Sequence, residues 1–195
     1  MKIGVLALQG GVIEHLNHLK ALGIEDVEVK TLSDLENLDG LILPGGESTT
    51  MGKILVQRNL LEPLKKKILE GLPVWGTCAG MILLAKELEG DTYSHLSTMD
   101  IKVKRNAYGS QLDSFTTNVL IKEVSTESIP LVFIRAPYIV EIGANVIVIL
   151  EVDGDIVAAK EKNMLVTSFH PELTDNLEFH KYFIEMCKGS VLEKH

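Results

Sequence analysis

The sequence predicts an α/β fold with an open, mostly parallel sheet, helices on both of its faces and an antiparallel extension. In residues 1–88, short apolar runs of strand length alternate with amphipathic stretches whose apolar residues recur at helical spacing. Buried strands separated by helices indicate parallel βαβ units. In residues 101–169, strand-like runs follow one another through short connections such as Asp153-Gly154-Asp155, which favour antiparallel hairpins.

The parallel part begins with a continuous apolar run at residues 3–8, which two adjacent glycines end. Apolar residues then recur every three or four positions up to Gly23, and this spacing predicts a first helix. Further helices are expected over residues 60–69 and 81–88. Three more strands are expected in this part, at residues 27–29, 40–43 and 73–75.

The second part of the chain is expected to supply six strands and a closing helix. The helix covers residues 176–187, where apolar side chains recur on one face. Because the chain contains no internal repeat and no linker, residues 1–195 are expected to form one domain. The six strands are expected at residues 101–105, 117–121, 131–135, 146–152, 156–160 and 164–169.

The composition excludes several classes of protein. The net charge of −8 argues against nucleic-acid binding, because neutralising phosphates requires clustered Lys and Arg. No apolar run approaches the roughly 18–20 residues that span a bilayer. Cys78 and Cys187 are the two cysteines, and two do not make a disulfide framework in a chain of 195 residues. We therefore expect a soluble cytoplasmic protein that binds neither nucleic acid nor membrane.

The first chemical motif is Gly76-Thr77-Cys78-Ala79-Gly80, between an expected strand and an apolar helix. Small residues on each side let the backbone turn sharply, which is the geometry of a nucleophile elbow with Cys in place of Ser. The start of the following helix favours the thiolate, and the backbone N–H of Ala79 can face a developing oxyanion. The alternative is a structural cysteine buried in a tight turn.

The second motif is the loop Pro44-Gly45-Gly46-Glu47-Ser48-Thr49-Thr50, which also follows an expected strand. Paired glycines let a backbone approach a ligand closely and donate N–H groups to it. A phosphate loop is disfavoured because no Gly-Lys-Ser/Thr ending is present and Glu47 would repel phosphate. A plain turn with a helix cap at Ser48 or Thr49 stays open as the alternative.

The third motif is Ser168-Phe169-His170-Pro171-Glu172. The proline favours an extended conformation at His170, so that Glu172 can hydrogen-bond one imidazole nitrogen and leave the other for a thiol. This is the pairing of a base with the group that orients it, as in a catalytic triad. Alone, the motif is also compatible with an ordinary surface loop.

The remaining histidines carry weaker signals. His15 and His18 lie one turn apart on the first expected helix, a spacing found in metal sites, but no nearby acidic or cysteine residue completes a site. Both are therefore expected at the surface, and no metal ion is expected. Cys187 falls among the apolar positions of the last helix and is expected in or beside the core. Three other histidines have no evident partners: His95, His180 and His195.

With the three motifs in this order, the chain resembles the triad-type (class I) glutamine amidotransferases, whose sheet is flavodoxin-like. It is more similar still to one branch, the glutaminase subunit of pyridoxal 5′-phosphate synthase. Many class I members carry Gln four residues after the nucleophile, where this chain has Ile82, and this branch tolerates an apolar residue there. The residues that carry the closer resemblance span nearly the whole chain: Leu8-Gln9-Gly10, the loop of residues 43–50, the elbow of residues 76–80, Arg105-Asn106, Gln111-Leu112-Asp113-Ser114-Phe115, Phe133-Ile134-Arg135-Ala136-Pro137 and residues 168–173.

The resemblance implies a role for each matching position. Cys78 would be the nucleophile, His170 the general base and acid, and Glu172 the group that orients His170. The oxyanion hole would consist of the backbone N–H groups of Gly46 and Ala79, completed by the Gln9 loop when a partner docks. Free glutamine carries a carboxylate that favours arginine. The implied glutamine-binding positions are Gly46, Glu47, Ser48, Arg105, Ile134 and Arg135.

The reaction implied is hydrolysis of L-glutamine to L-glutamate and ammonia through a cysteine thioester, without a metal or organic cofactor. Because nothing in the chain resembles a synthase domain, the partner implied is a separate pyridoxal 5′-phosphate synthase subunit in a hetero-oligomeric complex. That subunit would use the ammonia with ribose 5-phosphate and glyceraldehyde 3-phosphate. Two alternatives stay open: another cysteine hydrolase on the same fold, such as a γ-glutamyl hydrolase or a small peptidase, and a non-catalytic binding subunit.

Overall fold

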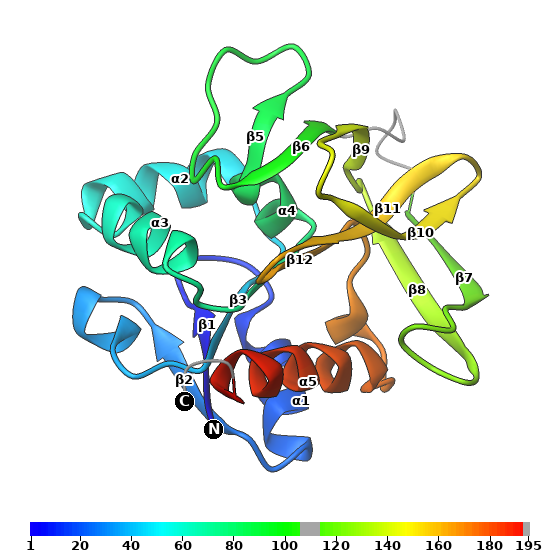
Figure 1. The fold of residues 1–195 in the computed structure, drawn as a ribbon, viewed down its shortest axis with the longest axis horizontal. Helices are drawn as coiled ribbons and strands as arrows, with labels where there is room; N and C mark the ends of the chain where they lie inside the picture. The colour runs from blue at the N-terminus through cyan, green and yellow to red at the C-terminus, as the bar shows by residue number, and fades with distance from the viewer. Residues whose placement is uncertain (106–113, 193–195) are drawn as a thin grey trace.

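A mixed sheet of ten strands lies at the centre of the computed structural model, which describes residues 1–105 and 114–192 (Figure 1). Its central strands, at Gly40–Leu43, Val74–Thr77 and Met164–Thr167, are buried along their whole length, as expected for strands covered on both faces. Five neighbouring strands run parallel, in the order β2 (Glu25–Val29), β1 (Lys2–Leu6), β3 (Gly40–Leu43), β4 (Val74–Thr77) and β12 (Met164–Thr167).

The other half of the sheet is the antiparallel extension that the sequence predicts. From β12 the order continues through β11 (Asp155–Glu161), β9 (Tyr138–Ile142), β6 (Met99–Lys104) and β5 (Ala85–Leu88). All of these pairings are antiparallel except the last, and β10 (Ile147–Val152) pairs antiparallel with β11 outside this path. A separate antiparallel pair is formed by β7 (Ser114–Leu120) and β8 (Ser128–Ile134).

Helices cover both faces of the parallel half, with α1 (Val12–Ala21) and α5 (Glu178–Leu192) on one side and α2 (Ser48–Gln57), α3 (Leu61–Leu69) and α4 (Ala79–Leu84) on the other (Figure 1). Two hydrophobic clusters fill the two interfaces. In β3, Ile42 belongs to the cluster on the α1 and α5 side, whereas Leu41 and Leu43 belong to the opposite cluster. Successive side chains of a strand point to opposite faces, so one apolar run supplies both cores. Short 3₁₀ helices occur at Leu32–Leu35 and Pro171–Leu173.

The prediction of a helix over residues 81–88 is wrong for its second half. Helix α4 ends at Leu84, and Ala85 leaves the helical region with φ −58° and ψ 136°. Residues Ala85–Leu88 then form β5, in which the two end residues are buried and the two middle residues are exposed. Pairing with β6 aligns Ala85 with Met99 and Leu88 with Val103, so a contact distant in sequence decides this segment.

Two further elements differ from the expectation. Strand β9 was not predicted, and α2 was anticipated only as a possible cap at Ser48 or Thr49. No helix within residues 1–105 and 114–192 is long and apolar enough to cross a membrane. The loops that follow β1, β3, β4 and β12 all leave the carboxyl edge of the parallel strands, where open α/β sheets bind ligands.

Candidate active site

Cys78 lies in a strained turn between β4 and α4. Its backbone has φ 48° and ψ −100°, a region that residues with a Cβ rarely occupy. Two flanking glycines permit the close approach of strand and helix. A Cβ at Gly80 would lie 2.1 Å from the carbonyl oxygen of Leu43, and one at Gly76 would lie 2.5 Å from the carbonyl carbon of Gly80. The strand–turn–helix geometry of the elbow is therefore present around Cys78.

His170 and Glu172 lie on the neighbouring loop after β12. The Nδ1 atom of His170 is 2.8 Å from the carboxylate oxygen Oε1 of Glu172, and both side chains are buried. The backbone N–H of His170 donates to the carbonyl oxygen of Val132 at 2.8 Å, which fixes the loop against β8. A Cβ at Gly45 would lie 2.4 Å from Cε1 of His170, so the glycine loop after β3 lies directly against the imidazole ring.

The surroundings of His170 favour the charged form of its imidazole ring. Burial by itself lowers the pKa of His170, but hydrogen bonds to Cys78 and to Glu172 outweigh it and raise the pKa to about 10. The imidazolium is therefore the resting form near neutral pH, with the thiol on one side and the carboxylate on the other. A positive ring beside Cys78 stabilises its reactive thiolate.

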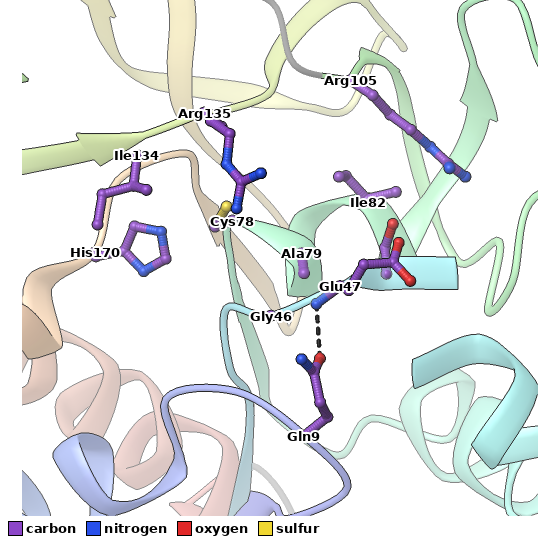
Figure 2. A pocket seen from close by; sticks show the side chains of 11 residues that line it. Gln9, Gly46, Glu47, Cys78, Ala79, Ile82, Arg105, Ile134, Arg135 and His170 are labelled. Atoms are coloured by element: carbon purple, nitrogen blue, oxygen red, sulfur yellow. Dashed lines mark hydrogen bonds between the residues drawn. The ribbon is translucent and has the colours of Figure 1, made fainter. Parts of the chain in front are cut away.

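A cavity of about 410 Å³ opens in front of Cys78 (Figure 2). The structure brings together at its wall every residue that the sequence assigns to substrate, nucleophile, base and oxyanion hole. Glu172 does not line the cavity, because it lies behind His170 and its side chain is only 1% exposed. The lining consists of Gln9, Gly46, Glu47, Ser48, Cys78, Ala79, Ile82, Arg105, Ile134, Arg135 and His170.

Two hydrogen bonds join the loop after β1 to the glycine loop after β3. Gly11 donates its backbone N–H to the carbonyl oxygen of Gly45 at 3.0 Å, and Glu47 donates its backbone N–H to Oε1 of Gln9 at 2.7 Å (Figure 2). A Cβ at Gly46 would lie 2.5 Å from that same Gln9 oxygen. Gln9 is therefore in direct contact with the backbone that was assigned to the oxyanion hole.

Glu47 caps α2 with its side chain. Its carboxylate accepts hydrogen bonds from the backbone N–H groups of Thr49 at 3.0 Å and Thr50 at 2.8 Å, and from the Thr50 hydroxyl at 2.6 Å. The hydrogen bond from the Thr50 side chain is the main cause that lowers the pKa of Glu47 to about 2. Its negative charge is therefore maintained at the rim of the cavity, where it can attract an ammonium group.

The two arginines that line the cavity come from different sheets. Arg105 follows β6, where its Nη1 donates to the Thr49 hydroxyl at 3.2 Å and its Nε lies 3.2 Å from a carboxylate oxygen of Asp91. Arg135 follows β8 with φ 44° and projects into the cavity (Figure 2). In the part of the chain that the structure describes, Arg135 forms no ion pair, so its charge is available to a ligand.

Two predictions about histidines are wrong: His15 is not at the surface, and His180 is not without a partner. His15 is fully buried, and its Nδ1 lies 2.9 Å from Nε2 of His180, which is also fully buried. His18, which is half-buried, has its Nδ1 3.1 Å from Nδ1 of His180. The position of His180 next to Phe179, within the apolar pattern of the last helix, was the signal that could have placed it inside.

The predictions for Cys187 and His95 differ in their outcome. Cys187 is fully buried, as predicted, whereas His95 is buried beside Tyr93. Several residues that were named for the resemblance or among the histidines lie outside the described residues: Asn106, Gln111, Leu112, Asp113 and His195.

The fold, with its cysteine site at the carboxyl edge of the sheet, is that of the class I glutamine amidotransferases. The chain belongs to the SNO glutamine amidotransferase family, whose family model matches residues 5–189. The fold class and the family that the sequence predicts are thereby confirmed.

Similar proteins agree over nearly the full length. The chain is 60% identical over 188 residues to a protein of Clostridium kluyveri named pyridoxal 5′-phosphate synthase subunit PdxT, covering 96% of this chain and 100% of that protein. A protein of the same name from Streptococcus pneumoniae is 58% identical over 192 residues, covering 96% and 98%. A crystal structure described as a glutamine amidotransferase is 41% identical, with a TM-score of 0.90 and coverage of 95% of this chain and 98% of that chain.

Proposed function

We propose that the chain hydrolyses L-glutamine to L-glutamate and ammonia through a thioester on Cys78. The observation that carries this proposal is the placement of Cys78 and His170 at the wall of one cavity that two arginines also line. We further propose that residues 1–195 act as one amidotransferase domain in the cytoplasm, where thiols stay reduced.

The proposed reaction is an acyl transfer in two steps. The thiolate of Cys78 attacks the side-chain amide carbon, and the backbone N–H groups of Gly46 and Ala79 donate to the oxyanion that forms. His170 donates its Nε2 proton to the leaving nitrogen, which departs as ammonia. The neutral imidazole then takes a proton from water, whose oxygen attacks the thioester and releases glutamate. Glu172 holds Nδ1 during both steps, so Nε2 stays directed at the reacting atoms.

Free glutamine differs from a peptide by its α-carboxylate, and Arg135 and Arg105 are the cavity's sources of positive charge besides His170. We propose that Arg135 binds this carboxylate and that Glu47 attracts the α-ammonium group. Arg105 is already held by Thr49 and Asp91, so its contribution is expected to be smaller. A small peptidase would need neither arginine.

Arg135→Gln is expected to raise the KM for glutamine by about 10- to 100-fold, since a hydrogen bond to a charged group contributes about 1.5–3 kcal/mol. Arg105→Gln is expected to raise it less, and kcat should change little in either variant. Steady-state glutamate release measures both constants. Arg58→Gln is the matched control, because Arg58 ends α2 and donates to the carbonyl oxygen of Lys30 outside the cavity. An unchanged KM in both arginine variants would favour the peptidase alternative.

We propose that the ammonia passes to a separate synthase subunit that makes pyridoxal 5′-phosphate from ribose 5-phosphate and glyceraldehyde 3-phosphate. The names of the relatives support this partner. So does the chemistry, because ammonia released into water at neutral pH is largely protonated and lost as a nucleophile. Direct transfer within a complex avoids that loss.

Isotope labelling tests the transfer. The chain is mixed with the synthase subunit, the two sugar phosphates, glutamine labelled with ¹⁵N at the amide, and excess unlabelled ammonium. The product is expected to carry mostly ¹⁵N, because the nitrogen does not equilibrate with the buffer. Product with the isotope ratio of the buffer would show that ammonia is released to solvent, and it would overturn the proposed transfer without touching the glutaminase chemistry.

A further inference from the structure

The carboxylate of Glu172 has a second oxygen, Oε2, which has no role in the proposed reaction. Oε1 of Glu172 contacts His170, whereas Oε2 is buried and has no hydrogen-bond partner within 3.5 Å among the described residues. Nε2 of His15 lies 3.6 Å from this oxygen. Both side chains are almost completely excluded from solvent, with exposed fractions of 0% for His15 and 1% for Glu172.

Three histidines continue this line of contacts towards the surface. Nδ1 of His15 is 2.9 Å from Nε2 of His180, and Nδ1 of His180 is 3.1 Å from Nδ1 of His18 on the half-buried side of α1. Burial lowers the pKa of His15 and of His180, with further lowering by the neighbouring histidines. Both rings are therefore neutral, and each carries one proton.

One arrangement of protons satisfies the three hydrogen bonds of the histidines and also directs an N–H at Glu172. In this arrangement His15 carries its proton on Nε2, which faces the carboxylate oxygen, and its Nδ1 accepts from Nε2–H of His180. The opposite tautomers form the same hydrogen bonds but leave Oε2 of Glu172 without a donor in front of it. Nδ1 of His180 accepts in turn from Nδ1–H of His18. The Thr77 hydroxyl, 3.3 Å from Nε2 of His15, shares the same proton and adjoins Cys78 in sequence. All donors thus point inwards, towards Glu172.

We propose that His15 is a positioning residue for the triad: its Nε2–H faces the second oxygen of Glu172 at 3.6 Å and limits the rotation of the carboxylate, and His180 fixes the ring in the tautomer that can do so. The proposal rests on the proposed chemistry of Cys78. The charged or titratable groups around His15 are Glu172, His170, His18 and His180. Among the described residues, no group of three or more His, Cys, Asp or Glu has the geometry to hold a metal ion, so metal binding does not explain the cluster.

The physical consequence is a fixed orientation of Glu172. A buried carboxylate oxygen without a donor is costly, and nothing then keeps the carboxylate group from rotating. A rotated Glu172 would no longer hold Nδ1 of His170, and the ring would lose its direction towards Cys78. His15 therefore acts on the thiol through two other side chains, without touching the substrate.

The test compares His15→Gln with His15→Met, two side chains of similar length that differ in the donor. The amide nitrogen of Gln takes the place of Nε2, whereas Met offers no proton. In the presence of the synthase subunit, His15→Met is expected to lower kcat for glutamine by about 10- to 100-fold, because the one N–H that faces the buried oxygen is removed and Glu172 no longer holds His170 in place, with KM within about twofold. His15→Gln is expected to stay within about threefold of the wild type.

Alkylation of Cys78 by iodoacetamide between pH 5 and 9 is the second readout. It reports the thiolate without glutamine or partner, so it stays informative even if glutamine is not the substrate. His15→Met is expected to lower the rate at pH 6–7 by about tenfold, towards that of Glu172→Ala, and His15→Gln to restore it. Thermal unfolding confirms that each variant is folded at the assay temperature.

A double-mutant cycle separates positioning from packing. When His15→Met is added to Glu172→Ala, the proposal expects no further loss of alkylation rate, because the oxygen that His15 faces is gone. Independent losses that multiply would overturn the proposal. Equal losses in His15→Met and His15→Gln would overturn it as well, since the shape of the ring and not its proton would then matter.

Discussion

Cys78→Ala is expected to lower glutamine hydrolysis by at least about three orders of magnitude, because the variant has no nucleophile that can form the thioester. The fold should persist. The substitution keeps the Cβ, so the strained φ of 48° and the packing between β4 and α4 stay the same. Glutamate release, measured with the synthase subunit present, gives the loss, and circular dichroism with thermal unfolding checks the fold.

Cys187→Ala is the matched control for this variant. Cys187 is the only other cysteine, and it lies fully buried on α5, outside the residues that line the cavity. Its removal is expected to leave kcat within about twofold, although the small cavity it creates lowers the unfolding free energy. Substantial hydrolysis by Cys78→Ala would contradict the proposed chemistry.

His170→Ala is expected to lower kcat by about a thousandfold, since the variant loses both the proton donor for ammonia and the base for water. It should also change the reactivity of Cys78. In the wild type, a positive imidazole ring beside Cys78 is expected to make alkylation by iodoacetamide fast near pH 7. In the variant, the rate should fall at pH 7 and rise only at more alkaline pH. An unchanged pH profile would show that His170 is not the partner of the thiol.

The same residue predicts a pH dependence of stability. The pKa of His170 is raised in the folded protein from about 6.5 in the unfolded chain to about 10. Protonation of His170 therefore stabilises the fold fully below about pH 6.5, and this contribution is lost as the pH rises through about 10. The difference in melting temperature between the wild type and His170→Ala should shrink across that window.

The parts of the site that the sequence predicts are those whose chemistry is local. Cys78 is flanked by small residues within five positions, and His170 and Glu172 are separated by one proline, so each motif carries its geometry with it. That the motifs meet follows from the fold class alone, because parallel strands deliver their loops to one edge of the sheet.

The parts that the sequence misses depend on contacts distant along the chain. Strand β9 follows β8 after only three residues, and its pairing with β6 and β11 is what defines it. His15 looks like a surface residue until α5 packs against α1 and brings His180, 165 positions away, to its ring. Spacing within one helix cannot show a partner on another.

Hydrolysis of free glutamine through Cys78 is the activity that this cavity is proposed to carry out. The most direct measurement is the initial rate of glutamate formation from L-glutamine by the wild type and by Cys78→Ala, each alone and mixed with the synthase subunit. The wild type is expected to release glutamate, Cys78→Ala is not, and the release by the wild type is expected to increase when the synthase is added. No release that depends on Cys78 in either condition, from a chain whose Cys78 still reacts with iodoacetamide, would contradict the proposed activity and direct attention to peptide and γ-glutamyl substrates.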